Sequence, residues 1–338
     1  MKTAVSSLFL FLAATVGASA QGFPTQTIRG FCRQSGSLNI VPFALNTQTG
    51  SMTTYPSYTL GPDHAGHYSA SGDEFSPTTV VTGIQPTGTG ATPERLVTLD
   101  MNTGTITQAA SGLSNAAFAG NSIAAVPLSS PFQMLVAQAA PGTATSPSTN
   151  IYRIGVASGA IDLTMNLPYS ATTSWRGSVA KAVSDIVNVD PTVTVLLQPC
   201  VSGVPQQFRR IDLTGQTSVA VSIDPSPGPA NTCLDAPQLV GGVFFALANT
   251  AGAYTMVDID LFGGNINYRE PGPSGWRRAP TSPYTYSATT QQIYALNDTQ
   301  TTLARFDTTG GDVTAQATAI TVAAPCVKGS IVSFATIQ

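Results

Sequence analysis

The chain has 338 residues, of which 42% are hydrophobic and only 9% charged, and its formal net charge is −3. Disordered chains combine low hydrophobicity with high net charge, so this composition excludes disorder. A pI near 5.2 without a run of Lys or Arg gives no basic field for nucleic acid. Thr, Ala, Gly, Ser, Val and Pro are common, in contrast to the Glu, Lys and Leu of helical bundles. We therefore expect an all-β fold.

The first 20 residues have the pattern of a secretory signal peptide. Lys2 is followed by an apolar run from Leu8 to Val16 and by small residues at 18–20, which are the three parts of such a signal. No later stretch approaches the about 20 continuous apolar residues of a membrane span. We therefore expect a secreted, extracellular protein whose mature region is 21–338.

One hairpin pattern recurs along the chain: an apolar-alternating strand, a turn with glycine, and a second strand. The turn glycines are Gly50, Gly104, Gly159, Gly215, Gly264 and Gly310. Each is expected to supply the positive φ that a tight hairpin needs. Asp100, Asp212 and Asp307 precede these turns and are expected to bond back to the turn backbone. Repeats of about fifty residues made of short strands are typical of propellers.

Two further strand-like runs precede each hairpin, so the repeat has the four strands of a propeller blade. The 318 mature residues divided by six give 53 residues per repeat, so we expect a single six-bladed β-propeller. Its closing blade would take the first strand from the C-terminal run GSIVSFATI and the other three from the N-terminus. Other first strands are expected at 121–128, 184–189, 236–241 and 284–290. The turn pattern resembles that of secreted or periplasmic propellers of the YVTN and NHL type.

Four cysteines in an exported chain predict disulfides. In the closing blade, Cys326 precedes the first strand and Cys32 ends the second, which predicts a Cys32–Cys326 link that closes the ring. Cys200 and Cys233 should face each other across a blade boundary and form the second link. The spacings match no zinc or redox motif, so no metal and no other cofactor is expected. The sequon at Asn297 predicts a glycoprotein.

Unusual side chains gather in three long connections between blades, at 57–77, 168–185 and 268–284. All three are expected on one face, and they contain both histidines and both tryptophans of the chain. A ligand-binding face is therefore expected from His64, His67, Trp175, Arg176, Trp276, Arg277 and Arg278. Trp offers a flat apolar surface and Arg a forked donor, which suits a sugar ring or an acidic group. The alternative is that the tryptophans fill blade junctions while the arginines bind loop carbonyls or carboxylates.

The sequence favours an extracellular binding protein for carbohydrate or a protein surface, and it leaves open whether the protein is an enzyme. As an enzyme it would be a polysaccharide lyase, a lactonase or a glycoside hydrolase, with His67, Tyr68 and Arg176 as catalytic candidates. The glycosidase carboxylates would come from Asp63, Asp73, Glu74, Asp185 and Glu270. A third alternative is a structural wall or matrix protein. We expect a monomer that binds neither nucleic acid nor membrane.

Overall fold

The computed structural model describes residues 27–34, 39–59, 69–72, 80–85, 94–100, 106–113, 123–128, 133–139, 148–155, 161–168, 181–184, 193–198, 200, 206–212, 214–224, 232–279, 282–310, 317–322 and 329–336. The signal-peptide prediction at 1–20 lies outside these residues. Every regular element among them is a β-strand, and none is a helix. No membrane-spanning helix therefore occurs in the described part of the chain.

The strands form antiparallel sheets that follow one another along the chain. One sheet has the order β25 (Gly329–Thr336), β1 (Thr27–Gln34), β2 (Asn39–Asn46) and β3 (Met52–Thr54), with β4 (Tyr58–Thr59) also on β2. The next sheet contains β5 (Ser69–Gly72), β6 (Val80–Gln85), β7 (Glu94–Asp100) and β8 (Ile106–Leu113). It is followed by β9 (Ile123–Leu128), β10 (Gln133–Ala139), β11 (Ser148–Gly155) and β12 (Ile161–Pro168).

The other three sheets complete the set among the described residues. They are β13 (Lys181–Ser184), β14 (Val193–Leu197), β15 (Gln207–Asp212) and β16 (Thr217–Ser222); β17 (Cys233–Val240), β18 (Val243–Thr250), β19 (Ala253–Ile259) and β20 (Ile266–Pro271); and β21 (Tyr284–Ser287), β22 (Gln292–Leu296), β23 (Thr302–Asp307) and β24 (Thr318–Thr321).

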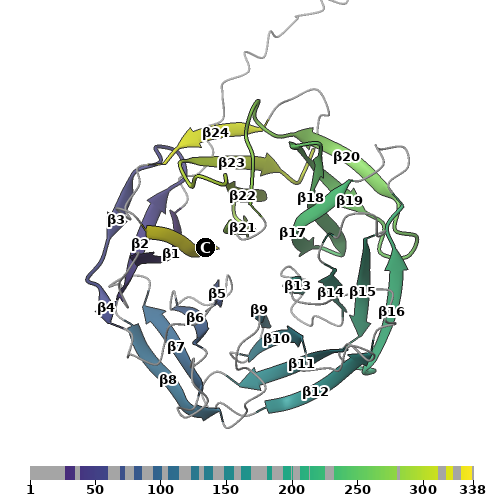
Figure 1. The fold of residues 1–338 in the computed structure, drawn as a ribbon, viewed down its shortest axis with the longest axis horizontal. Coiled ribbons are helices and arrows are strands. Elements are labelled where there is room, and N and C mark those ends of the chain that lie inside the picture. Colours follow the sequence, from purple (N-terminus) through teal and green to yellow (C-terminus); the bar gives the residue numbers. More distant parts are fainter. Residues whose placement is uncertain are drawn as a thin grey trace, which may run out of the picture.

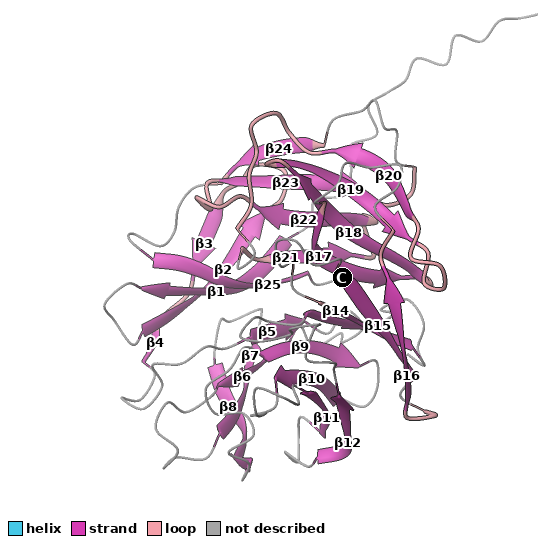
Figure 2. Cartoon of the chain, turned by 45° about the vertical axis from the view of Figure 1, so that its right-hand side comes forward, coloured by secondary structure: helices cyan, strands magenta, loops and turns pink. Residues whose placement is uncertain are grey.

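The sheets stand around a common centre, as Figure 1 shows, with β5, β9, β13, β17 and β21 nearest the centre. The last strand of each sheet, such as β8, β12, β16, β20 and β24, lies at the rim. Figure 2 shows the same ring turned, with each sheet steeply twisted. β25 pairs with β1, so strands from the two ends of the chain belong to one sheet. The chain is all-β and has the architecture of a β-propeller, in which each sheet is a blade.

The hydrophobic core lies between neighbouring sheets. Phe208 of β15 and Phe244 of β18 belong to one buried cluster between two sheets, with their ring centroids 5.1 Å apart. A second cluster joins Phe43 and Leu45 of β2 to Leu296 of β22 and Leu303 of β23. A third joins the β17–β20 sheet to the β21–β24 sheet. Burial of apolar side chains therefore holds these four neighbouring sheets together.

The hairpin turns between third and fourth strands confirm the expected role of two aspartates. Asp212 Oδ1 accepts hydrogen bonds from the backbone N–H groups of Thr214 and Gly215, at 2.9 and 3.0 Å. Asp307 Oδ1 likewise accepts from the backbone N–H of Thr309, at 2.8 Å. The side chain of Asp100, for which the same role is predicted, lies outside the described residues.

The prediction that glycine occupies the positive-φ position is right for Gly50 and Gly264, with φ of 70° and 73°. It is wrong for Gly215, because the positive-φ residue of that turn is Gln216, with φ of 51°. Gly310 does not have a positive φ either. In the Gly215 turn the expected glycine is one residue too early, because the positive-φ residue is the fourth after Asp212, as Gly50 is the fourth after Asn46 and Gly264 the fourth after Asp260. Gly104 and Gly159 lie outside the described residues.

Parts of the three connections expected as loops are strands. β4 and β5 lie within 57–77, and β13 takes up residues 181–184 of the connection 168–185. The first strand expected at 184–189 is therefore β13, displaced toward the N-terminus. Arg269 and Glu270 belong to β20 and not to a loop. SASG in β5 and KAVS in β13 have too little apolar alternation to be recognised as strands.

The predicted link between Cys200 and Cys233 is confirmed, with a Cα–Cα distance of 5.5 Å. Cys200 follows β14 and Cys233 opens β17, so the link joins two neighbouring sheets. Cys32 is fully buried in β1 and is disulfide-bonded. Its predicted partner, Cys326, lies outside the described residues.

Candidate functional site

One face of the ring carries the turns between second and third strands together with the connections between sheets. Its described part contains the β18–β19 turn at 250–252, the β22–β23 turn at 297–301, and residues 272–279 and 282–283 of the connection 272–283. We call this the loop face. The connection and the second turn are joined directly, because the backbone N–H of Asp298 donates to the carbonyl of Arg277, at 2.9 Å. Residues 276–278, expected in a binding site, lie here.

Trp276 is 5% exposed and fills the junction between two sheets. Its ring makes edge contacts with Tyr254 of β19 and Phe306 of β23, at centroid distances of 5.3 and 5.9 Å. The indole Nε1–H donates to the carbonyl of Thr302, at 3.4 Å. This is the junction-packing role that the sequence left as the alternative, and the buried ring has no face available to a ligand.

Arg278 is also buried, and it holds the connection against both sheets. Its guanidinium forms an ion pair with Asp235 of β17 and donates to the carbonyl of Ser282. It lies 5.1 Å from the ring centroid of Tyr284, and burial lowers the pKa of Arg278 to about 10. Burying a guanidinium is tolerable only when its charge is paired and its donors are used. Asp235 supplies the negative charge that pairs with the guanidinium of Arg278.

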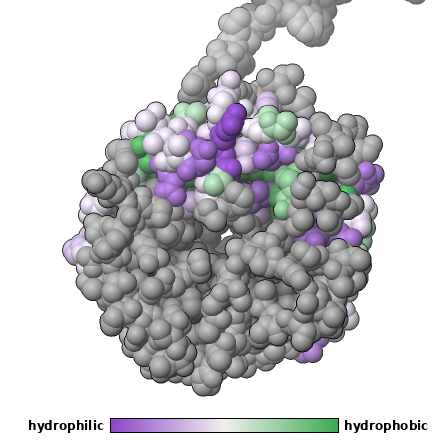
Figure 3. Space-filling view, in the orientation of Figure 1, coloured by the Kyte–Doolittle hydropathy of each residue, from purple (hydrophilic) through white to green (hydrophobic). Residues whose placement is uncertain are grey.

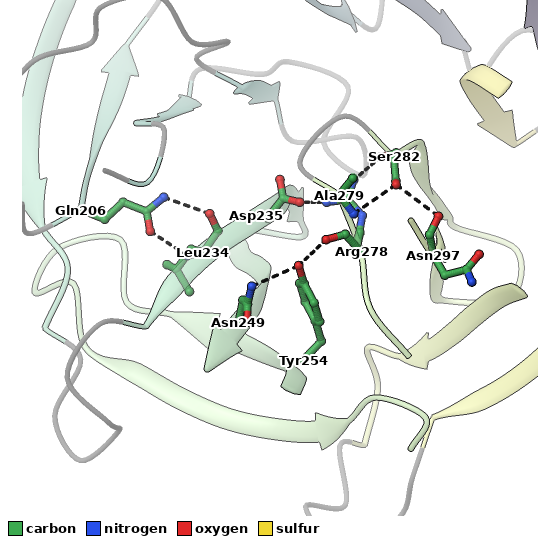
Figure 4. Close-up of polar contacts among 9 residues, drawn as sticks. All are labelled: Gln206, Leu234, Asp235, Asn249, Tyr254, Arg278, Ala279, Ser282 and Asn297. Carbon is green, nitrogen blue, oxygen red and sulfur yellow. Dashed lines mark hydrogen bonds and ion pairs between the residues drawn. The ribbon is translucent and has the colours of Figure 1, made fainter. Parts of the chain in front are cut away.

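Further hydrogen bonds extend this contact along the loop face, as Figure 4 shows. The hydroxyl of Tyr254 donates to the carbonyl of Arg278, at 2.6 Å, and accepts from Asn249 Nδ2, at 3.2 Å. Burial raises the pKa of the Tyr254 hydroxyl. The hydroxyl of Ser282 donates to the carbonyl of Asn297, at 3.2 Å. The connection 272–283 is therefore fixed to turns on both sides.

A paired contact at the next junction joins Gln206 to the backbone of β17. Gln206 Nε2 donates to the carbonyl of Leu234, at 2.9 Å, and its Oε1 accepts from the N–H of Leu234, at 2.7 Å. Gln206 is 6% exposed, so these bonds satisfy a buried amide. Together with the Cys200–Cys233 disulfide, they hold the β13–β16 sheet to the β17–β20 sheet.

Arg277 differs from its two neighbours because its side chain is exposed. Its Cζ lies 4.0 Å from the position that a Cβ would take on Gly252, so the guanidinium rests against the β18–β19 turn. Among the described residues it forms no ion pair. The exposed hydroxyls of Thr299 and Thr301 belong to the adjacent turn. Figure 3 shows one face of the molecule, on which the described side chains are mostly pale or hydrophilic.

Glu270 is one of the carboxylates considered for a glycosidase. In the structure its side chain joins two sheets. It is 9% exposed, and its Oε2 accepts a hydrogen bond from the backbone N–H of Asp307 in the next sheet, at 2.7 Å. Burial raises the pKa of the Glu270 carboxyl, while the bond from Asp307 opposes the rise. The side chain thus links two sheets.

The remaining predicted site residues lie outside the described residues. These are His64, His67, Tyr68, Trp175 and Arg176, together with the carboxylates Asp63, Asp73, Glu74 and Asp185. The structure brings Trp276 and Arg278 together with partners that the sequence did not single out, Asp235 and Tyr254. Asn249 joins this group through its bond to Tyr254, as Figure 4 shows, and Gln206 acts at the next junction. Within the described part of the chain, no group of His, Cys, Asp and Glu is arranged to hold a metal.

No protein-family model matches the chain, and no curated protein matches it by sequence. Solved structures do match over most of its length. TolB from Acinetobacter baumannii has a TM-score of 0.51 at 13% identity, covering 93% of this chain and 67% of that one. A candidate 6-phosphogluconolactonase from Bacteroides fragilis has a TM-score of 0.52 at 11% identity, covering 93% and 98%. A triple arginine mutant of AofleA from Arthrobotrys oligospora has a TM-score of 0.51 at 11% identity, covering 90% and 89%. These proteins are β-propellers, and the likeness is one of fold.

Proposed function

We propose that this chain is a secreted six-bladed β-propeller that acts as an extracellular binding protein. Its ligand would be a carbohydrate or the surface of another protein, engaged by the loop face. In this proposal the β25–β1 pairing closes the ring and the six sheets are the complete set of blades. Rigid sheets that hold irregular loops at one end are the usual support for a binding surface.

The observation that carries the proposal is the contrast between Arg277 and its neighbours. Trp276 and Arg278 are buried and anchor the connection, which fixes the backbone on both sides of Arg277. The exposed guanidinium is left with free donors and rests on a turn that has no side chain at Gly252. An arginine held in this way loses little conformational entropy on binding and suits carboxylate or hydroxyl acceptors.

The test is a glycan array, with protein pulldown in parallel, using the mature protein and two arginine variants. We expect Arg277→Ala to weaken binding of the captured ligand about tenfold, the loss of one to two charge-assisted hydrogen bonds. On the glycan array, Arg210→Ala is the matched control, because Arg210 lies at the opposite end of the sheets from Arg277, and it should bind glycan as the wild type does.

Equal binding by wild type and Arg277→Ala would exclude this residue from the ligand contact. Turnover of a captured polysaccharide or lactone, abolished by His67→Ala while binding persists, would instead establish a lyase, lactonase or glycoside hydrolase. Tyr68→Phe and Arg176→Ala would then test the other catalytic candidates. No ligand on the array or in the pulldown would leave the structural wall or matrix protein as the better account.

A further inference from the structure

The opposite end of the sheets carries the turns between third and fourth strands, and we call it the turn face. Among the described residues the exposed large hydrophobic side chains are Val219, Val243 and Phe262, at 51%, 41% and 77% exposure. Phe262 lies in the β19–β20 turn, and Val219 lies on β16 of the neighbouring sheet. A single exposed apolar residue needs no explanation, but a cluster does.

Arg210 joins the two residues into one patch. It lies opposite Val219 in the pairing of β15 with β16, and its Cζ is 4.2 Å from the ring centroid of Phe262. Neighbouring side chains on paired strands are in contact distance. The patch Val219–Arg210–Phe262 therefore spans the junction between the β13–β16 and β17–β20 sheets at its exposed end.

The guanidinium donors of Arg210 are not used by the carboxylates of the adjacent turns, among the described contacts. Both oxygens of Asp260 accept from turn N–H groups, those of Phe262 and Gly263, at 3.0 and 2.9 Å. Asp212 accepts from two N–H groups of its own turn through Oδ1. Arg210 forms no ion pair with a described residue. A carboxylate from outside the chain is the complementary group.

Among the described residues, the outer edge of β16, the strand beside the patch, is covered only at its end. β16 pairs with β15 and, within the described residues, with no other strand, although the carbonyl of Ser222 lies against Gly264 of the β19–β20 turn. Its sequence TSVAVS contains no charged residue and no proline, the two features with which natural proteins usually protect an edge strand. An unprotected edge of β-branched residues is suited to the addition of an extended segment.

The other rim strands are better protected. β20 carries Arg269, Glu270 and Pro271, and β12 contains Asp162 and ends at Pro168. β3 and β24 are only 3 and 4 residues long. β8 has no charge, but its pairing with β7 is interrupted by two register shifts, which twist an edge away from regular pairing.

We propose that the edge of β16, together with the patch Val219–Arg210–Phe262, is a docking surface for an extended acidic segment of a partner protein. The segment adds to β16 as a strand through backbone hydrogen bonds. An apolar side chain packs between Val219 and Phe262, and a carboxylate pairs with Arg210. This surface is separate from the loop face, because the two lie at opposite ends of the same strands.

The probe is a set of synthetic eight-residue peptides of alternating Thr and Val with Glu, Gln or Lys at one central position. Binding to the mature protein is measured by fluorescence polarisation. We expect the Glu peptide to bind at least tenfold more tightly than the Lys peptide, and Arg210→Ala to remove that difference. A Glu peptide with N-methyl groups on alternate residues should not bind, because it cannot pair with an edge strand.

Val219→Asp should abolish binding of the Glu peptide, whereas Val243→Asp, at the other exposed valine, and Arg277→Ala should leave it unchanged. The proposal is overturned if the Glu peptide does not bind, if the N-methylated peptide binds equally, or if Glu and Lys peptides bind alike. It is also overturned if sedimentation shows a wild-type dimer that Val219→Asp dissociates, because the occupant is then a second copy of this chain.

Discussion

Two adjacent arginines on the loop face have opposite surroundings. Trp276 and Arg278 are buried in the junction, while Arg277 between them is exposed. Asp235 and the carbonyl of Ser282 make the inward arginine tolerable.

At the same scale, the buried carboxyl of Glu270 predicts a pH-dependent contribution to stability. Its pKa is raised by burial in the folded state, so the folded protein holds this proton more tightly than the unfolded chain does. The stabilisation is fully present below the unfolded-state pKa of about 4.3, and it is lost as pH rises through the higher folded pKa. We therefore expect Glu270→Gln to gain stability relative to wild type as pH rises from 4 to 7.

Thermal melts of wild type and Glu270→Gln across this range measure the effect as a growing difference in Tm. Thr299→Ser, which changes no titratable group in the β22–β23 turn, is the control and should show a constant difference. A Glu270→Gln difference that is also independent of pH would mean that the carboxyl has the same pKa in the folded and unfolded states, with its desolvation compensated by the backbone bond from Asp307 and by Arg305.

At the scale of single elements, two of the turns that begin outer strands lie in close contact with the sheet before them. A Cβ on Gly50 would lie 1.8 Å from the carbonyl oxygen of Thr321 in β24, and a Cβ on Gly264 would lie 2.0 Å from that of Ser222 in β16. Both glycines also have a positive φ. We expect Gly50→Ala to lose more than the about 1–2 kcal/mol of left-handed backbone strain alone, because the β3 turn must move away from β24.

Gly241→Ala is the matched control for this prediction. Gly241 also has a positive φ, of 55°, but no atom lies within 4 Å of the position of an added Cβ. Chemical denaturation of the two variants separates backbone strain from the clash between sheets. If both variants lose the same free energy of unfolding, the turn of Gly50 is not in close contact with β24 in solution.

The same elements show how far the sequence predicts this fold. Alternating apolar runs gave the hairpin strands, and Asp212 and Asp307 behave as the turn pattern requires, because both signals are local. In the β15–β16 turn, the sequence assigned the positive φ to Gly215, because glycine is the residue usually found at that position. The residue with the positive φ is the next one, Gln216. β5 was missed and β13 was expected too far along the chain, because their four residues owe their strand conformation to sheet pairing and not to their own sequence.

At the scale of the whole molecule, contacts between sheets decide the roles of the candidate site residues. The partners of Arg278 and Trp276 come from other sheets, and no local pattern connects Arg278 with Asp235 or Trp276 with Phe306. The sequence therefore predicted an unusual cluster of side chains on one face, but not which of them are exposed. The Cys200–Cys233 link was predictable because it depends only on where strands begin and end in successive repeats.

At the same scale, a disulfide between Cys32 and Cys326 is expected to close the ring. Cys32 is disulfide-bonded in β1, beside the strand β25 that enters from the C-terminal end, and a non-reducing peptide map should find it linked to Cys326. A cross-link between distant ends removes more unfolded-state entropy than one within a short loop: on the order of 5 kcal/mol, against about 3–4 kcal/mol for the Cys200–Cys233 link. Cys326→Ser should therefore lower the Tm more than the Cys200→Ser, Cys233→Ser double variant does. A map that pairs Cys32 otherwise, or a Cys326→Ser protein with an unchanged Tm, would show that β1–β25 pairing and core burial close the ring unaided.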